Sequence, residues 1–174
     1  IRSLAAGLQL PELQSLETAD VARRALREFQ RKTGSTVEFI AGDFKELHVS
    51  LKLNIRTRNR VGTVFGGSIY SSVDPYFMLM LMEVLGKNYV VWDKGASMKF
   101  IRPITSQVKC RFLITDEQEA EIRQKIAENG EYSFDLPIQY EDEAGQVYAT
   151  FNKVVYAADK AFYKKKIAEK QKKA

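Results

Sequence analysis

Two glycines and an aspartate in the segment FGGSIYSSVDPYF, residues 65–77, are the residues best suited to carry chemistry. Gly66 and Gly67 lack side chains, so a ligand atom can approach the backbone closely at the start of the predicted helix. The first N–H groups of a helix have no intrahelical acceptor and favour negative charge, so they could stabilise an oxyanion. Asp74 adds a carboxylate that could act as a general base or as a nucleophile.

The same residues also have structural explanations, and both explanations stay open. An aspartate N-cap followed by proline at the first helical position is a common start of a helix, and Asp74 stands directly before Pro75. Proline inside a continuous helix removes a hydrogen bond and disfavours helical geometry at the preceding residue. A helix kinked at Pro75 would be compatible with both roles of Asp74. Gly66 and Gly67 could instead form a turn or allow tight packing against a sheet.

The spacing of these residues predicts a homodimer. Asp74 comes about two helical turns after the glycines, or roughly 11 Å along a helix axis. This separation is too large for both groups to contact one carbonyl from the same helix. A site that uses both groups would therefore need a second copy of the chain.

The composition indicates one globular domain. The chain has 174 residues, of which 45% are apolar and 11% aromatic, enough for a substantial core. Its longest near-continuous apolar run, from Tyr76 to Val84, is far shorter than the roughly 20 residues that span a bilayer, so we expect no membrane span. The sequence begins without the pattern of a secretory signal, and we expect a cytoplasmic protein.

The single cysteine and the single histidine point away from thiol and metal chemistry. Cys110 falls in an alternating apolar pattern, which predicts a core thiol in a reducing compartment. His48 lies on the polar face of a predicted strand, which predicts an exposed or rim position. With only one cysteine and one histidine, the chain cannot supply the several Cys and His ligands of a typical metal cluster, and the pattern does not indicate a Cys/His nucleophile pair. We therefore expect no metal and no redox cofactor.

The net charge of +5 is concentrated in a C-terminal tail. Residues 160–174 hold seven lysines and one glutamate, a net +6, which leaves −1 for the rest of the chain. The tail has no arginine, and Phe162 and Tyr163 stand together at its start rather than between the lysines as stacking platforms would. We expect no nucleic-acid partner and a solvated, partly helical segment. The alternative is an arm that attracts phosphates or a membrane surface.

Hydrophobic periodicity predicts an α+β fold in three segments: an N-terminal helical segment (1–36), a domain (37–157) and the lysine-rich tail (158–174). Residues 78–85 leave almost no polar side, and a helix apolar all round is buried. A meander of strands covers one such helix only by curling around it. Thr115 is the expected N-cap of a helix inserted among the strands, and Gly130 ends it. The predicted strands are 37–41, 47–55, 89–92, 96–104, 107–115, 132–140 and 147–155, and the flanking helices are 18–32 and 116–128.

The motifs resemble those of hotdog-fold thioesterases of the phenylacetate-pathway type. Those enzymes carry an asparagine, a His-Gly-Gly at the start of the central helix, an acid nine positions after that histidine, and later a Phe-Leu-Arg-Pro strand. The matching positions here are Asn59, Phe65-Gly66-Gly67, Asp74 and Phe100-Ile101-Arg102-Pro103. The resemblance covers residues 37–157. It is closer still to an uncharacterised hotdog family, a domain-of-unknown-function group regarded as thioesterases.

The resemblance implies a hotdog fold, with about five to six antiparallel strands curved around one long central helix. It also implies hydrolysis of an acyl-CoA or acyl-carrier-protein (acyl-ACP) thioester by a homodimer or a dimer of dimers. Asp74 would be the base or nucleophile, and the N–H groups of Gly66 and Gly67 the oxyanion donors. The candidate substrate-binding residues are Asn59, Phe65, Ser71 and Phe100.

Two positions depart from the resemblance. Phe65 replaces the family histidine, and Pro75 follows the acid directly. Both favour an alternative, a non-catalytic acyl-binding or regulatory hotdog dimer in which Asp74 only caps a helix. A hotdog dehydratase or hydratase fits less well, because it uses a catalytic histidine and His48 lies on a strand before the helix.

Overall fold

The computed structural model describes residues 27–28, 30–31, 36–40 and 44–172. The N-terminal helix expected over residues 18–32 lies outside the described residues, apart from four helical positions at 27, 28, 30 and 31. Within the part of the chain that is described, no helix is long and apolar enough to cross a membrane.

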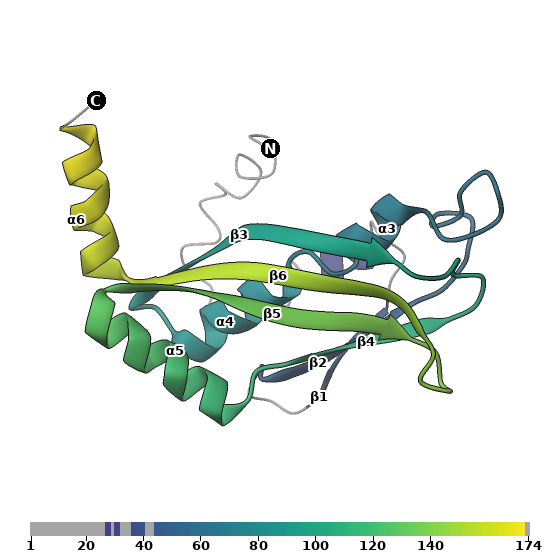
Figure 1. Ribbon diagram of the computed structural model, residues 1–174, viewed down its shortest axis with the longest axis horizontal. Coiled ribbons are helices and arrows are strands. Elements are labelled where there is room, and N and C mark those ends of the chain that lie inside the picture. Colours follow the sequence, from purple (N-terminus) through teal and green to yellow (C-terminus); the bar gives the residue numbers. More distant parts are fainter. Residues whose placement is uncertain (1–26, 29, 32–35, 41–43, 173–174) are drawn as a thin grey trace.

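Six strands of the described chain form one antiparallel sheet in the order β1-β2-β4-β5-β6-β3, which agrees with the five to six strands that the resemblance implies. Strands β5 and β6 pair along most of their length, and β3 pairs with the other side of β6 (Figure 1). The strands are β1 (Thr36–Ile40), β2 (Glu46–Leu51), β3 (Tyr89–Phe100), β4 (Val108–Leu113), β5 (Glu131–Glu141) and β6 (Val147–Asp159).

Two predictions for strands need correction. Residues 89–92 and 96–104 were expected as two strands, but residues 89–100 form the single strand β3, because a bulge between Asp93 and Gly95 absorbs the irregularity without ending the strand; residues 101–104 lie beyond its end. Strand β2 ends at Leu51 rather than at residue 55. The reason is a turn in which the side-chain oxygen of Asn54 accepts hydrogen bonds from the N–H groups of Arg56 (2.8 Å) and Thr57 (3.2 Å).

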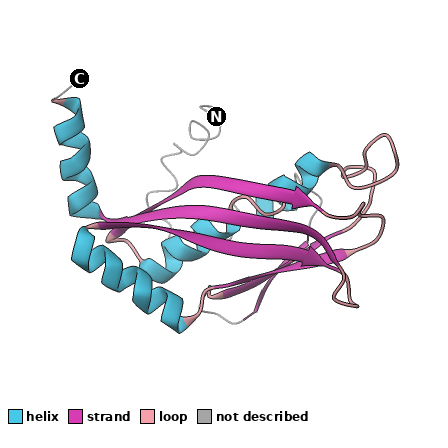
Figure 2. Ribbon diagram, viewed as in Figure 1, coloured by secondary structure: helices cyan, strands magenta, loops and turns pink. Residues whose placement is uncertain are grey.

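The sheet covers one apolar helix, α4 (Tyr76–Leu85), as a hotdog fold requires (Figure 2). Its core-facing side chains are fully buried, and the rings of Tyr76 and Phe77 both meet Phe112 of β4 edge-on, with centroids 5.2 and 4.9 Å apart. Cys110 of β4 is buried beside them, which confirms the expected core thiol, and burial raises the pKa of that thiol. The α+β hotdog architecture is therefore confirmed.

The central helix is not continuous, contrary to the prediction of one long helix. Helix α3 (Gly66–Ser71) is followed by a turn over residues 72–75 and then by α4. Pro75 has no N–H to donate and disfavours helical geometry at the residue before it, so the helix breaks there. The break is anchored to the sheet, because the buried hydroxyl of Ser72 lies 2.8 Å from the hydroxyl of Tyr140 on β5.

The two remaining helices lie at the end of the sheet opposite α3 (Figure 1). Helix α5 (Asp116–Asn129) begins with a capping box between Thr115 and Gln118 and ends at Gly130, whose φ of +79° is favourable for glycine, as the sequence predicts. The lysine tail forms helix α6 (Lys160–Gln171), capped by Asp159, whose carboxylate accepts two backbone hydrogen bonds.

Candidate active site

The start of α3 presents two backbone donors. Phe65, in extended geometry, is the N-cap, and Gly66 and Gly67 are the first two helical residues. The N–H of Ser68 already donates to the carbonyl of Phe65 at 2.9 Å. The N–H groups of Gly66 and Gly67 are therefore the ones that have no intrahelical acceptor, as expected for a helix start.

Both glycines also make room for aromatic rings. A Cβ atom on Gly66 would lie 2.8 Å from the ring of Phe100, and one on Gly67 would lie 2.4 Å from the ring of Phe65. Neither distance is tolerable for a carbon contact, so larger residues would displace these rings. The tight-packing explanation of the glycines thus has a physical basis here, and it is compatible with open donors because the rings contact the Cβ side of the backbone.

A hollow of about 410 Å³ opens beside the first glycine. Gly66 and Ile69 of α3 form one wall, and the segment after β3, from Phe100 to Ile104, forms the other. The hydrogen bonds that hold the segment in place include those from the N–H of Val64 to the carbonyl of Ile104 and from the N–H groups of Ile101 and Arg102 to the carbonyl of Tyr148. The hollow is large enough for part of an acyl thioester.

Asp74 lies in the turn between α3 and α4 and is held by a buried lysine. Its carboxylate accepts a hydrogen bond from Nζ of Lys153, at 2.9 Å, and the same ammonium lies 3.2 Å from the carboxylate of Asp93. The side chain of Lys153 is only 2% exposed, whereas those of Asp74 and Asp93 are 46% and 24% exposed. Of the two explanations left open for Asp74, the capping of a helix is not observed, because Pro75 is the N-cap of α4 and no side-chain capping bond is present there.

The electrostatics of this cluster, which we call the Lys153 cluster (Asp74, Asp93 and Lys153), follow from burial. Desolvation raises the pKa of Asp93, and the nearby charge of Lys153 only partly opposes this effect. Burial by itself would lower the pKa of Lys153, but its bonds to both carboxylates outweigh that effect and hold the pKa above its ordinary value. One oxygen of Asp93, Oδ1, is buried and has no hydrogen-bond partner among the described residues.

Tyr70 is a further neighbour of the cluster. It lies on α3, and its hydroxyl has a raised pKa, first because of partial burial and next because of the negative charge of Asp74. The phenol therefore stays protonated at neutral pH and is a hydrogen-bond donor on the side of Asp74.

Three of the predicted substrate-binding residues line the hollow or its glycines. Asn59 and Phe100 line the hollow, and the ring of Phe65 lies against Gly67. The amide of Asn59 is occupied within its own loop, where it accepts from the N–H groups of Val61 and Thr63, both at 3.0 Å. A loop-forming role is therefore visible for Asn59, and its role in substrate binding stays a prediction.

The remaining predicted residues lie elsewhere. Ser71 is half-buried in the last turn of α3. His48 is on β2, where its ring nitrogen Nε2 lies 2.9 Å from the carboxylate of Glu46, in keeping with the expected rim position.

Sequence reasoning missed Lys153 and Asp93. A signal for Lys153 was present, because it occupies an inward position in the alternation of β6, between the buried residues Phe151 and Val155. Charged residues are seldom buried without a partner, so a lysine at an inward position of β6 predicts a carboxylate nearby. Asp93 had no comparable signal, because it stands in the irregular part of β3 next to the bulge.

The geometry defines the class of protein by its fold, which is the hotdog fold. A Pseudomonas aeruginosa protein of unknown function described as a probable thioesterase superposes with a TM-score of 0.68 at 18% identity, covering 83% of this chain and 97% of that one. A Haemophilus influenzae thioesterase superposes with a TM-score of 0.57 at 11% identity. The match covers 83% of this chain and 92% of that one. The Escherichia coli PaaI protein of the phenylacetic acid degradation operon superposes with a TM-score of 0.54 at 14% identity. The match covers 81% of this chain and 97% of that one. At these identities the likeness establishes the fold.

The chain belongs to the family described as a domain of unknown function, DUF4442, whose model matches residues 29–156. This match spans the whole described sheet except the end of β6. No functionally curated protein matches the chain in sequence.

Proposed function

We propose that the protein is an acyl thioesterase that hydrolyses the thioester of an acyl group with coenzyme A or an acyl carrier protein. The observation that carries the proposal is the Asp74 carboxylate, held at the break between α3 and α4 by the buried Lys153 in a hotdog fold. The solved relatives described as thioesterases support the reaction class.

The reaction needs little from the protein because a thioester is already activated. The N–H groups of Gly66 and Gly67 would bind the carbonyl oxygen and stabilise the oxyanion that forms on it; removing one such donor typically costs about two to three powers of ten in rate. Asp74 would take a proton from water as the water oxygen bonds to the carbonyl carbon. The C–S bond then breaks, the sulfur leaves as a thiolate that takes up a proton, and the acyl group leaves as a carboxylic acid. Direct attack by the Asp74 carboxylate is the alternative first step.

A homodimer would bring these groups together. In the described part of the chain β3 pairs with β6 alone, so its other edge presents unpaired backbone groups along a 12-residue strand. Phe100 lies at one end of β3 and contacts Gly66. Asp93 lies toward the other end, where Lys153 joins it to Asp74. If two β3 strands pair antiparallel about a two-fold axis, the Phe100 end of one lies alongside the Asp93 end of the other. The glycines of one subunit would then face Asp74 of its partner.

The test is release of free thiol from short, medium, long and aryl coenzyme A thioesters, with the wild type beside Asp74→Asn. We expect the wild type to cleave at least one of them and kcat to fall about a hundredfold or more in the variant, because general-base catalysis is lost. Full activity in a folded Asp74→Asn dimer would refute the mechanism.

A non-catalytic acyl-binding dimer is the second candidate. The aromatic rings of Phe65 and Phe100 against the glycines favour it, because they narrow the access to the helix start. Binding of acyl thioesters without cleavage of any of them would establish this alternative.

A further inference from the structure

A loop rich in arginine lies directly before α3. We call residues 52–64 the arginine loop; it carries Lys52, Arg56, Arg58 and Arg60, and the whole stretch from 47 to 73 contains no aspartate or glutamate. All three arginines are exposed. Among the described residues none of them forms an ion pair with a carboxylate, although Arg56 donates to the carbonyl of Arg31 at 3.4 Å.

Hydrogen bonds within the loop hold its backbone in a defined conformation. The amide of Asn59 donates to the hydroxyl of Thr63 at 2.7 Å, and the backbone of Arg58 bridges to that of Val64. Near the other end the hydroxyl of the buried Thr57 donates to the carbonyl of Lys52 at 2.8 Å. These bonds fix the backbone on either side of Asn59, so only the side chains of Arg58 and Arg60 have to be ordered when an anion binds.

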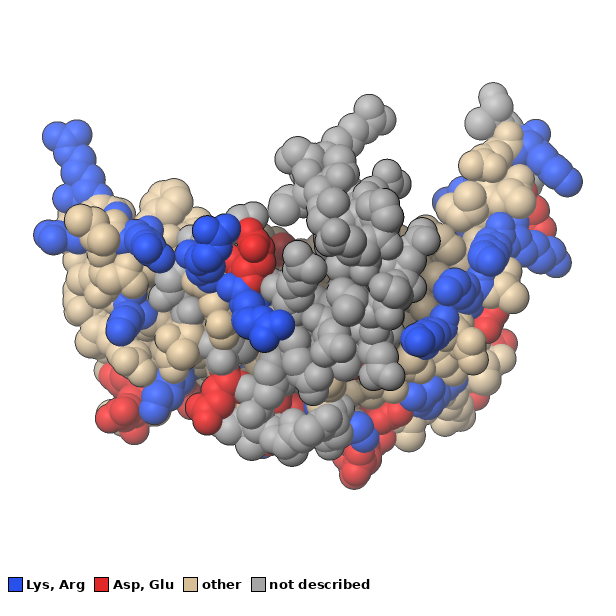
Figure 3. Space-filling view, turned by 180° about the vertical axis from the view of Figure 1, so that it is seen from behind, with Lys and Arg blue, Asp and Glu red and all other residues tan. Residues whose placement is uncertain are grey.

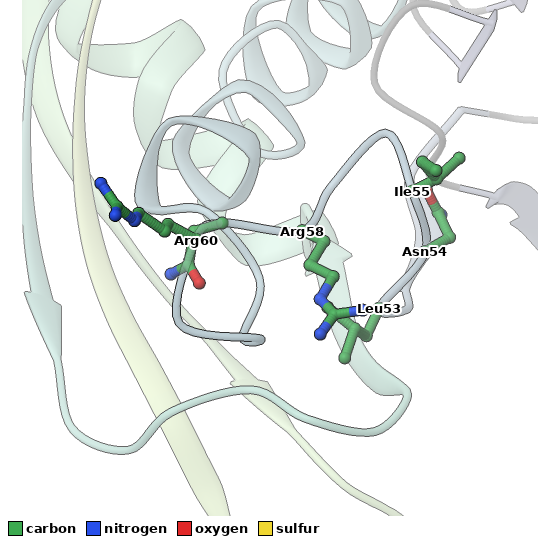
Figure 4. A pocket seen from close by; sticks show the side chains of 6 residues that line it. Leu53, Asn54, Ile55, Arg58 and Arg60 are labelled. Carbon is green, nitrogen blue, oxygen red and sulfur yellow. The ribbon is translucent and has the colours of Figure 1, made fainter.

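The arginine loop is continuous with the candidate active site. The N–H of Phe65, the N-cap of α3, donates to the carbonyl of Thr57 at 2.7 Å. A second hollow, of about 550 Å³, is lined by the loop and shares Asn59 with the hollow beside Gly66. Arg58 and Arg60 both line this second hollow, and Figure 4 shows their side chains extending from the loop in different directions, that of Arg58 toward Leu53.

The chemistry of the loop suits phosphate groups carried by a partly apolar molecule. Guanidinium groups bind phosphates through paired hydrogen bonds, and these arginines have no carboxylate competing for them among the described residues. Ile55 and Val61, in the same loop, are 95% and 81% exposed and offer an apolar surface beside the charges. The lysine tail is less well placed, because α6 lies at the opposite end of the molecule (Figures 1 and 3).

We infer that the arginine loop binds the phosphates of a nucleotide-bearing thiol carrier, with Arg58 and Arg60 as the main contacts, so that coenzyme A rather than a carrier protein delivers the acyl group. The inference rests on the proposed function for the acyl end of the ligand. The nucleotide would lie against the arginine loop. The thiol arm would pass Asn59, which lines both hollows, and reach the glycines.

The test compares the double variant Arg58→Gln/Arg60→Gln with a matched control, Lys164→Gln/Lys165→Gln, which removes two exposed charges from α6. The same acyl group is offered as its coenzyme A thioester and as its N-acetylcysteamine thioester, which has no phosphate. We expect the loop variant to raise KM for the coenzyme A thioester about ten- to a hundredfold at unchanged kcat, with no change for the small thioester. Added salt should raise the wild-type KM and have little effect on the variant. The control should behave as the wild type does.

A binding measurement separates this inference from the proposed function. Adenosine 3′,5′-bisphosphate is titrated calorimetrically into the wild type and both double variants, without any turnover. Weaker binding in the loop variant alone supports the inference even if no thioester is cleaved. Equal binding of the bisphosphate by all three proteins would overturn the inference. So would a loop variant whose KM rises equally for the coenzyme A thioester and for the N-acetylcysteamine thioester. So does binding to anionic phospholipid vesicles that depends on Arg58 and Arg60 while nucleotide binding does not, since the loop would then be a lipid contact.

Discussion

At the scale of single residues, Lys153 determines how the candidate site is arranged. Its ammonium is buried on the concave side of the sheet and contacts two carboxylates, from the helix break and from β3. This ammonium favours the charged form of Asp93, against the effect of burial, and it donates a hydrogen bond that holds the carboxylate of Asp74. Asp93 is the more deeply placed acid, and its raised pKa reflects the cost of burying a second negative charge beside a single cation.

Lys153→Met should destabilise the protein and shift its dependence on pH. Removing the cation leaves two partly buried carboxylates unpaired, so we expect a loss of about 2 kcal/mol in the free energy of unfolding. This is less than for a fully buried pair, because Asp74 is half-exposed. In the variant the folded-state pKa of Asp93, already above its ordinary value, should rise further, because the charge of Lys153 no longer opposes the effect of burial. Stability is then greatest at low pH and falls as pH rises from about 4 toward neutrality.

Urea unfolding at pH 5 and pH 8 measures both effects, with Lys109→Met as the control. Lys109 is an exposed lysine of β4, 3.4 Å from Glu143, and its removal should change stability by less than about 0.5 kcal/mol. If Lys153→Met is no less stable than this control at pH 8, then the buried ammonium does not hold the cluster together.

At the scale of elements, the break between α3 and α4 places Asp74 in contact with β6. In a continuous helix the residue at position 74 would take helical geometry and follow the helix axis. Because the chain turns at residues 72–75 instead, the carboxylate reaches the ammonium of Lys153 on the sheet. Ser72 and Tyr140 hold the same turn from the buried side.

Pro75→Ala should weaken this placement. Alanine restores an N–H group and permits helical geometry at Asp74, so α3 and α4 can merge and draw the carboxylate away from Lys153. We expect kcat for thioester cleavage to fall about tenfold or more, with a small gain of helix signal in circular dichroism. Unchanged kcat together with a measurable gain of helix would show that the break is not needed for the reaction.

At the scale of the whole molecule, the two halves of the proposed site lie toward opposite ends of β3. Gly66 lies against Phe100, and the Lys153 cluster lies around Asp93. One subunit therefore holds two half-sites that are separated along the strand by roughly 20 Å. Exposed side chains of β3, including Trp92 and Phe100, would be covered if a second copy paired with this edge.

Mixed dimers should recover activity that neither parent has. Asp74→Asn removes the base, and Gly66→Val forces a side chain into the ring of Phe100, which should displace the start of α3 that carries the donors. In a heterodimer of the two, one site carries both changes and the other carries none. Random mixing should then restore about a quarter of the wild-type activity. Thiol release is measured before and after subunit exchange, and size-exclusion chromatography checks that each parent is a folded dimer. A mixture no more active than its parents would contradict a shared site.

Much of the fold was predictable because its determinants are local. Alternation with period two marked the strands, the fully apolar run marked the buried helix, and Thr115 and Gly130 marked the ends of α5. The glycines and Asp74 were found as candidates through their spacing in one short segment. The sequence predicted one long central helix, and a kink at Pro75 was weighed only as a condition under which both roles of Asp74 are compatible; the break itself was not predicted.

The partners of Asp74 could not be predicted in the same way. Lys153 is 79 positions away along the chain, and it meets Asp74 only because the register of β6 turns its side chain toward the helix break. Asp93 joins them through the bulge in β3, and the rings of Phe65 and Phe100 reach the glycines through packing. The sequence by itself thus determined the fold class and the segment with the candidate donors and acid. Only the tertiary structure decided the charge environment of that acid, because burial and ion pairing depend on which distant residues the folded sheet brings together.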